Sequence, residues 1–212
     1  MSDKGGDQNQ TERIKVTLIG SSGVGKTCIL ERYTKKIFNE NRVATIGVKY
    51  FEKNLEIENR KVLLNIWDAA GQEKFRSLGK HFYKDADIVC LVYDITSLES
   101  FKDLQEIWYK DLQTFGEKYT ILAVVGSESD CYENEEVPED EARNYAEQIN
   151  AIYMLTSAKK GNNIENLFDA LVRKYFRPEF IKKVEEMKSD RGEVTKITKE
   201  KVQKEKKKNK CC

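Results

Sequence analysis

The chain reads Gly20-Ser21-Ser22-Gly23-Val24-Gly25-Lys26-Thr27 directly after a short aliphatic run, residues 14–19, and directly before a stretch with helical periodicity. This is the pattern G-x-x-x-x-G-K-[ST] in the strand–loop–helix context that it requires. The backbone N–H groups of such a loop and the positive end of its helix can surround a polyphosphate. Lys26 would neutralise the phosphate oxygens, and Thr27 offers a hydroxyl to Mg²⁺. The alternative is an ordinary glycine turn, and motif and context together favour phosphate binding.

Strand-length apolar runs recur at residues 62–67, 88–93, 121–125 and 152–155, and stretches of helical period separate the later ones. One helix is expected to open at the capping box Thr96-Ser97-Leu98-Glu99. Its apolar stripe comprises Phe101, Leu104, Trp108, Leu112 and Phe115, and the stripe of a later helix comprises Ile164, Leu167, Phe168, Leu171, Val172, Tyr175 and Phe176. Alternating strands and helices predict an α/β fold, a mostly parallel sheet covered on both faces. Residues 48–57 and 61–67 are too close for a crossover helix, so we expect an antiparallel hairpin at one edge.

The charges are balanced overall but unevenly distributed. The 37 Lys+Arg and 36 Asp+Glu give a net charge of +1, which argues against a uniformly basic protein that binds nucleic acid. Residues 181–212 hold 12 of the basic and 6 of the acidic side chains, so this segment carries about +6 and the rest about −5. The few apolar side chains of residues 181–212 cannot drive the folding of that segment. We therefore expect a disordered leader at residues 1–12, one domain at 13–177 and a flexible tail at 178–212.

Targeting and cysteine patterns point to a protein of the reducing cytosol. Residues 1–13 are polar and charged, unlike a secretory signal, and the apolar runs are too short to cross a membrane. The five cysteines form an odd total without the C-x-x-C spacing of zinc or redox sites. A compartment that keeps thiols reduced fits best.

A second motif, Trp67-Asp68-Ala69-Ala70-Gly71-Gln72-Glu73, follows a predicted strand. There Asp68 can hold Mg²⁺ through water and Gln72 can orient an attacking water. With this motif the sequence resembles the small GTPases, and the resemblance to the Rab branch extends from about residue 15 to 176 and resumes at the C-terminus. Other stretches that carry it are Thr45-Ile46-Gly47-Val48-Lys49-Tyr50, Phe75-Arg76-Ser77-Leu78, Phe82-Tyr83, Leu91-Val92-Tyr93-Asp94-Ile95-Thr96, Thr156-Ser157-Ala158-Lys159 and Cys211-Cys212.

The resemblance implies a three-layer P-loop small-GTPase fold, with a six-stranded, mostly parallel sheet that binds GTP or GDP with Mg²⁺. The nucleotide-binding residues that it implies are Ser22, Gly23, Val24, Gly25, Lys26, Thr27, Cys28, Phe38, Thr45, Gly71, Asp130, Ser157, Ala158 and Lys159, with Thr27, Thr45 and Asp68 on the metal and Gln72 as the catalytic residue. Phe38 would pack edgewise on guanine, although a simple core position is an equal alternative. Trp67 is expected in the core, because aromatic side chains usually anchor packing.

The base-recognition motif departs from the family pattern. Where the family has Asn-Lys-x-Asp, this chain reads Ser127-Glu128-Ser129-Asp130. By the resemblance, Asp130 still pairs with the guanine N1–H and 2-amino group, and the Ala158 N–H still meets O6. Guanine selectivity is therefore expected to survive. Affinity is expected to fall, because serine reaches fewer partners than asparagine and Glu128 replaces a lysine that would cover the base. Ala69 also stands where the family usually has threonine.

The resemblance implies a Rab-like switch that hydrolyses GTP slowly and regulates vesicle and membrane trafficking by recruiting effectors in the GTP state. The partners that it implies are an exchange factor, a GAP, a GDP-dissociation inhibitor, a Rab escort protein and effectors, with no nucleic acid, for a monomer. Prenylation of Cys211 and Cys212 would place it on the cytoplasmic face of an intracellular membrane, cycling with the cytosol. One alternative is a membrane-tethered Rab-like interaction module that binds nucleotide weakly. Another is a P-loop nucleotide kinase, whose chemistry would leave Thr45, Gln72 and the paired cysteines without a role.

Overall fold

Six strands form a single sheet in the computed structural model, which describes residues 11–40, 44–45, 47–69, 84–117 and 120–181. The strands are β1 Glu12–Ile19, β2 Val48–Ile57, β3 Arg60–Ala69, β4 Ile88–Asp94, β5 Ile121–Ser127 and β6 Ile152–Leu155. Their order is β2-β3-β1-β4-β5-β6, and every neighbouring pair is parallel except the β2–β3 hairpin. This confirms the predicted α/β fold, including the antiparallel hairpin at one edge.

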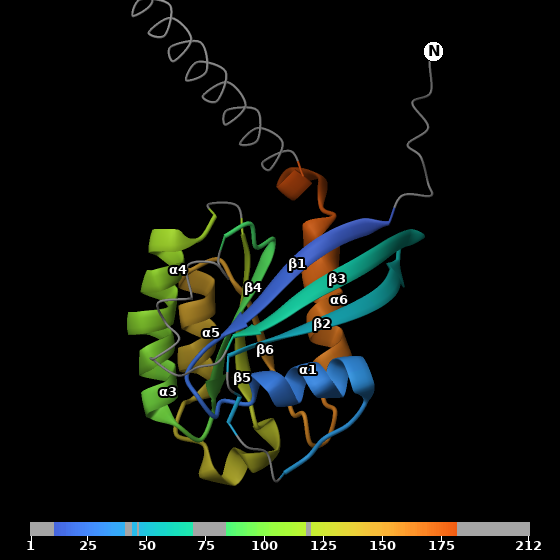
Figure 1. Cartoon of the computed structure of the whole chain (residues 1–212). Coiled ribbons are helices and arrows are strands. Elements are labelled where there is room, and N and C mark those ends of the chain that lie inside the picture. The colour runs from blue at the N-terminus through green and yellow to red at the C-terminus, as the bar shows by residue number, and fades with distance from the viewer. Residues whose placement is uncertain (1–10, 41–43, 46, 70–83, 118–119, 182–212) are drawn as a thin grey trace, which may run out of the picture. The chain divides into compact units, whose positions relative to one another are not determined.

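Helices cover both faces of the sheet (Figure 1). They are α1 Lys26–Lys35, α3 Leu98–Asp103, the π-helical turn η2 Leu104–Trp108, α4 Tyr109–Phe115, the 3-10 segment η3 Ser129–Asn134, α5 Glu139–Gln148 and α6 Ile164–Tyr175. On one face Tyr33 of α1 stacks on Phe168 of α6, with ring centroids 3.8 Å apart. On the other face Phe101 of α3 packs on Tyr93 of β4. The result is the predicted three-layer arrangement of helix, sheet and helix.

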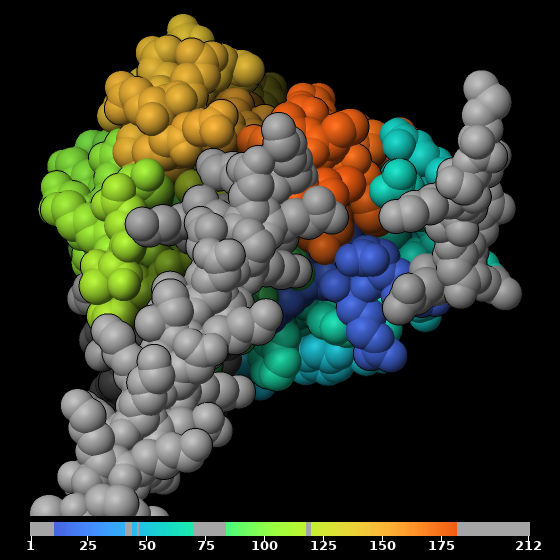
Figure 2. Space-filling model, turned by 90° about the horizontal axis from the view of Figure 1, so that it is seen from above, coloured from blue at the N-terminus to red at the C-terminus, as the bar shows by residue number. Residues whose placement is uncertain are grey.

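The α5 side of this second face is closed by aromatic contacts between helices. Tyr145 of α5 meets Phe101 and Tyr109 edge-on, with centroids 5.9 and 6.1 Å away. Figure 2 shows α4 (green) and α5 (gold) side by side on the surface above this contact. Edge-to-face pairs of this kind add stability beyond the area that they bury.

Contacts divide the chain into two units, residues 1–173 and residues 174–212. The first contains the whole sheet. In the second, the structure describes residues 174–181, where Tyr175 packs against Phe176 and Phe180. Residues 1–10 of the predicted leader and most of the predicted tail lie outside the described residues. At Glu12 the prediction of a disordered leader is wrong, because Glu12 is the first residue of β1 and pairs with Val62 of β3.

Several local predictions are corrected by the structure. The residue that caps α3 is Ser97 and not Thr96, because the Ser97 hydroxyl accepts the Ser100 N–H at 3.2 Å. Thr96 instead bonds the carboxylate of Asp94 through both its N–H and its hydroxyl. Phe115, predicted in the buried stripe, is 38% exposed, because α4 ends there at Gly116.

The hairpin and Trp67 also differ from expectation. The connection between β2 and β3 is the two-residue turn Glu58-Asn59, with φ of 52° and 62°, because β3 begins at Arg60, one residue before the expected start at 61. Positive φ at both residues is the geometry of tight hairpin turns that match the twist of the strands. Trp67 is only half-buried and lies against Tyr50 at 5.1 Å on the outer face of the hairpin. Side chains alternate along β3, so the buried Ile66 and Asp68 leave Trp67 facing outward.

The parallel order brings distant segments to one edge of the sheet. The carboxyl ends of β1, β4, β5 and β6 all point the same way, and β3, parallel to β1, ends there too. The loops after these strands therefore meet, as ligand-binding loops do in open α/β sheets.

Candidate functional site

A cavity of about 500 Å³ opens at this edge of the sheet. It is lined by residues from the loop before α1, from the start of α1, from the segment after α1, from the ends of β3 and β5 and from the loops after β5 and β6. The lining residues are Ser22, Gly23, Gly25, Lys26, Thr27, Cys28, Ile29, Phe38, Asn39, Glu40, Ala44, Thr45, Asp68, Ala69, Ser127, Glu128, Asp130, Cys131, Ala158 and Lys159. The volume falls within the range of pockets that hold small molecules and cofactors.

Glycines allow the phosphate loop to take its path. Gly20 has φ of 145°, and a Cβ there would lie 2.1 Å from the Val92 carbonyl oxygen of β4. Gly25, with φ of 80°, is the residue before α1, so that the helix begins at Lys26. The first of these positions needs the absence of a side chain, and the second needs a left-handed backbone that glycine adopts readily.

Lys26 is the buried cation of the pocket. Its Nζ donates to the carbonyl oxygens of Gly20 at 2.8 Å and Ser21 at 2.7 Å, and the residue is only 6% exposed. Burial lowers the pKa of Lys26 to about 8, and the negative charge of Asp68 opposes that shift only in part. A buried ammonium costs free energy unless anionic groups compensate it. The loop is therefore suited to a strongly negative ligand such as a polyphosphate.

Three oxygen-bearing side chains meet beside Lys26. The Thr27 hydroxyl donates to Oδ2 of Asp68 and lies 2.8 Å from the Thr45 hydroxyl. Asp68 is fully buried at the end of β3. Two hydroxyls and one carboxylate form a set of hard oxygen donors, the ligand type that Mg²⁺ prefers. The donor set thus fits the metal that the sequence predicts at these residues.

The opposite end of the pocket is organised around Asp130. The Ser157 hydroxyl donates to Oδ1 of Asp130 at 2.5 Å and accepts the Lys160 N–H at 3.0 Å. The Ser129 N–H bonds the Thr156 carbonyl, which ties the loop after β5 to the loop after β6. These contacts fix the direction of the carboxylate that would pair with a base.

The two substituted residues of the motif behave differently. Ser127 is buried, and its hydroxyl donates to the Tyr93 carbonyl of β4 at 3.0 Å, so the hydroxyl is hydrogen-bonded within the sheet. Glu128 lines the pocket with a left-handed backbone, φ 59°. Burial, followed by the negative charges of Asp94 and Asp130, raises the pKa of the Glu128 carboxyl. Glu128 thus places a second carboxyl near Asp130, at the position where the resemblance leads us to expect a lysine that covers the base.

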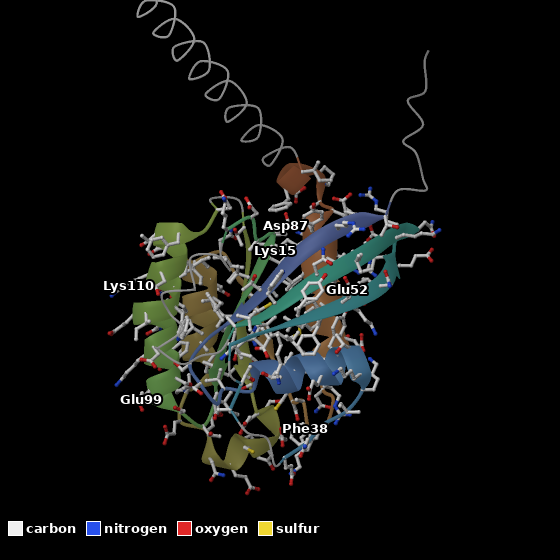
Figure 3. The ribbon with its side chains drawn as sticks, in the orientation of Figure 1. Lys15, Phe38, Glu52, Asp87, Glu99 and Lys110 are labelled. Atoms are coloured by element: carbon white, nitrogen blue, oxygen red, sulfur yellow. The ribbon has the colours of Figure 1, made fainter. Side chains whose placement is uncertain are left out.

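Two positioning contacts were not predicted from the sequence. Arg32 of α1 donates from Nε to the Ala158 carbonyl at 2.5 Å and from Nη2 to the Lys159 carbonyl at 2.7 Å. Its guanidinium also lies 6.0 Å from the ring of Phe38, which Figure 3 shows near the lower end of the molecule. Lys159 in turn forms an ion pair with Glu40 at 2.6 Å, which raises the pKa of Lys159. No local pattern signals the contacts of Arg32 with the loop at Ala158 or of Lys159 with Glu40, because the two residues of each contact are more than 100 positions apart in the sequence.

The structure brings most of the predicted site residues to this one cavity. Val24 lies beside it with its side chain buried, and Ser157 lies behind Asp130 without lining the cavity. Phe38 lines it and is half-buried, which places it at the pocket and not in the core. Gly71, Gln72, Cys211 and Cys212 lie outside the described residues.

A phosphate loop between β1 and α1, facing a carboxylate-bearing loop at the same edge of the sheet, defines a P-loop nucleotide-binding protein. Comparison with known proteins narrows the class. The Ras family model matches residues 15–177. The chain belongs to the Ras family, within which it is a Rab-like small GTPase.

Individual relatives are similar over the same region. Ras-related protein Rab-30 from Homo sapiens is 42% identical over 154 residues, which are 73% of this chain and 75% of that protein. Ras-related protein Rab5A from Oryza sativa subsp. japonica is 35% identical over 166 residues, 78% of this chain and 81% of that protein. Ras-related protein Rab-19 from Rattus norvegicus is 32% identical over 163 residues, 76% of this chain and 75% of that protein.

The buried charge of Lys26 predicts a pH dependence of stability in the nucleotide-free protein. Because the folded-state pKa of about 8 lies below the ordinary lysine value of 10.5, the unfolded chain binds more protons between these values. The free energy of unfolding should therefore rise with pH from about 8 upward, by at most about 1.4 kcal/mol per pH unit. Urea denaturation of nucleotide-free wild type and Lys26→Met from pH 7.5 to 9.5 measures this. The unfolding free energy of wild type minus that of Lys26→Met should rise as pH rises, and a constant difference would contradict the prediction.

Proposed function

We propose that this Rab-like GTPase binds GTP and GDP with Mg²⁺ and acts as a slow, GAP-dependent switch in vesicle and membrane trafficking. The observation that carries the proposal is the cavity in which buried Lys26 and oriented Asp130 occupy opposite ends. A cation suited to phosphates and a carboxylate suited to a base match the two ends of a guanine nucleotide.

The residues predicted for the nucleotide site have proposed roles. Residues 22–28 would surround the phosphates, with the Lys26 ammonium as their cation. Thr27, Thr45 and Asp68 would hold Mg²⁺, which supplies positive charge to the β- and γ-phosphates. Asp130 and the Ala158 N–H would read guanine, and Phe38 would cover its edge. The Gly71 N–H would contact the γ-phosphate, and Gln72 would orient the attacking water. Because this catalysis is positioning and charge stabilisation, a GAP that adds positive charge would accelerate it.

A surface close in sequence to the proposed metal ligands Thr45 and Asp68 supports effector recruitment. A hollow of about 360 Å³ is lined by Lys15, Tyr50, Asn65 and Trp67, and Tyr50 is 47% exposed. Trp67 directly precedes Asp68, and Tyr50 lies five residues after Thr45, so changes at the metal ligands reach this surface over a short distance. Exposed aromatic side chains of this kind favour protein partners.

The tail supplies a proposed membrane attachment. Cys211 and Cys212 follow a lysine-rich run, and we propose that both are prenylated and act with the lysines at an anionic leaflet. Among the residues that the structure describes, no helix is both long and apolar enough to cross a bilayer. The proposed site of action is the cytoplasmic face of an intracellular membrane. Exchange factor, GAP, GDP-dissociation inhibitor and escort protein are the corresponding partners.

One observation favours a second candidate, a Rab-like interaction module that binds nucleotide weakly. Ser127 bonds to the sheet, and Glu128 adds a negative charge beside Asp130. The phosphate half of the pocket nevertheless keeps its lysine and oxygen ligands, which favours a switch with fast exchange over an empty pocket.

The nucleotide content of the purified protein tests the proposed function. Denaturation should release close to one guanine nucleotide per chain, and an empty protein would support the interaction module instead.

Gln72→Leu should bind GTP as wild type does but hydrolyse it about 100-fold more slowly with a cognate GAP, because the attacking water loses its orientation. Hydrolysis by Gln72→Leu at the wild-type rate, with and without the GAP, would exclude the role of Gln72.

The base end of the pocket gives a prediction for exchange. Ser127→Asn with Glu128→Lys should slow GDP release by about tenfold or more, because it restores polar contacts worth about 1–3 kcal/mol each and removes a negative charge. Stopped-flow release of a fluorescent GDP measures the rate, with Glu133→Lys as a charge control in η3, where Glu133 is exposed. Asp130→Asn should shift preference from guanine toward xanthine. Release from the double variant at the wild-type rate would mean that other residues complete the pocket.

The tail gives a prediction for localisation. Replacing Cys211 and Cys212 by serine should move the protein from membranes to the soluble fraction, because a lysine run without lipid gives only weak, salt-sensitive binding. Fractionation of cells that express wild type and the double variant measures this, and mass spectrometry of the wild-type C-terminus identifies the modification. Membrane association of the double variant equal to wild type would rule out lipid anchoring at these cysteines.

A further inference from the structure

Ser21 of the phosphate loop is bonded to a helix on the far side of the loop. Its hydroxyl donates to Oδ2 of Asp103 at 2.8 Å and accepts the indole N–H of Trp108 at 3.2 Å. Asp103 is the last residue of α3 and Trp108 the last residue of η2. One hydroxyl thus joins residues 82 and 87 positions away in the sequence.

The π-helical turn explains how both partners reach the same atom. Asp103 and Trp108 are five residues apart, and in a regular α-helix they would point about 140° apart around the axis. In η2 the Tyr109 N–H bonds the Leu104 carbonyl five residues earlier. This wider turn brings residues five apart onto one side. Glu99 and Lys110 of the flanking helices point outward, away from this side (Figure 3).

The backbone of Ser21 connects this contact to the phosphate-binding lysine. The Ser21 carbonyl accepts Nζ of Lys26 at 2.7 Å, next to the Gly20 carbonyl at 2.8 Å. Gly20 itself is held against the Val92 carbonyl so closely that no Cβ would fit. The carbonyls that aim Lys26 are therefore fixed from two sides, by β4 through Gly20 and by α3–η2 through Ser21.

We infer that Asp103 and Trp108 are positioning residues of the nucleotide site, which hold Ser21 so that its carbonyl directs Lys26 to the phosphates. The inference rests on the proposed function, since it concerns the same phosphate site. It assigns a role to the π-helical turn, a feature that is frequent at functional sites. Neither residue lines the cavity, so both act through Ser21.

The test is the GDP release rate of a series of single variants. Ser21→Ala, which removes both bonds, and Asp103→Leu, which leaves the Ser21 hydroxyl without its acceptor, should each release GDP about 10-fold faster. Trp108→Phe, which loses only the N–H donor, should release it about 3-fold faster. Asp103→Asn keeps a side-chain oxygen that can accept the hydroxyl, and it should stay within about 2-fold of wild type. Glu106→Leu, at an exposed position in η2, is the matched control and should also stay within about 2-fold.

A double variant separates positioning from general destabilisation. If Asp103 acts through Ser21, Ser21→Ala with Asp103→Leu should release GDP no faster than Ser21→Ala alone, because the bond is already absent. Release rates of Ser21→Ala equal to wild type, failure of Asp103→Asn to rescue, or additive effects in the double variant would each overturn the inference. Thermal unfolding of each variant in GDP shows that the compared proteins are folded. A wild-type protein that binds no GDP would overturn the proposed function itself, which distinguishes the two failures.

Discussion

The burial of the Lys26 ammonium is the constraint on which the nucleotide site depends. A cation that is 6% exposed needs carbonyl oxygens close by, and the loop supplies them only if Gly20 packs against β4 and Ser21 is held from outside. The same burial lowers the pKa of Lys26, so the folded protein carries a cost that a polyphosphate would remove. Relief of this desolvation cost would add to the free energy of binding a polyphosphate.

At the proposed base end of the pocket, tertiary contacts hold Ser127 and Asp130 in place. Ser127 contributes to the sheet through the Tyr93 carbonyl, and Asp130 keeps its direction through Ser157. Arg32 holds the carbonyls of Ala158 and Lys159 from α1, so the helix that begins at the phosphate loop also supports the loop that we propose to recognise the base. The two ends of the site therefore share one rigid element.

The outer layer of helices contributes to the site as well as to the core. Phe101, Leu104 and Trp108 are buried against the sheet, yet Trp108 also bonds to Ser21 of the phosphate loop. A single extra residue per turn in η2 makes both roles compatible. On the opposite face, the Tyr33–Phe168 stack joins α1 to α6.

The sequence by itself determined the strand–loop–helix phosphate motif, the alternation of strands and helices, the edge hairpin and most of the residues that line the pocket. The motif, the alternation and the hairpin depend on spacing over a few residues, which periodicity and turn chemistry encode directly. Most of the other pocket residues were expected only because the sequence resembles the small GTPases. Local rules failed where two of them competed: Ser97 and Thr96 could both cap α3, and outward-facing Trp67 had the hydrophobicity of a core residue. Only the tertiary structure decided that Arg32 holds the loop at Ala158 and that Asp103 and Trp108 hold Ser21. The two residues of each pair are 82 to 126 positions apart in the sequence. They meet because the parallel strand order brings the loops after β1 and β6 to the edge of the sheet where the helices of their partners begin.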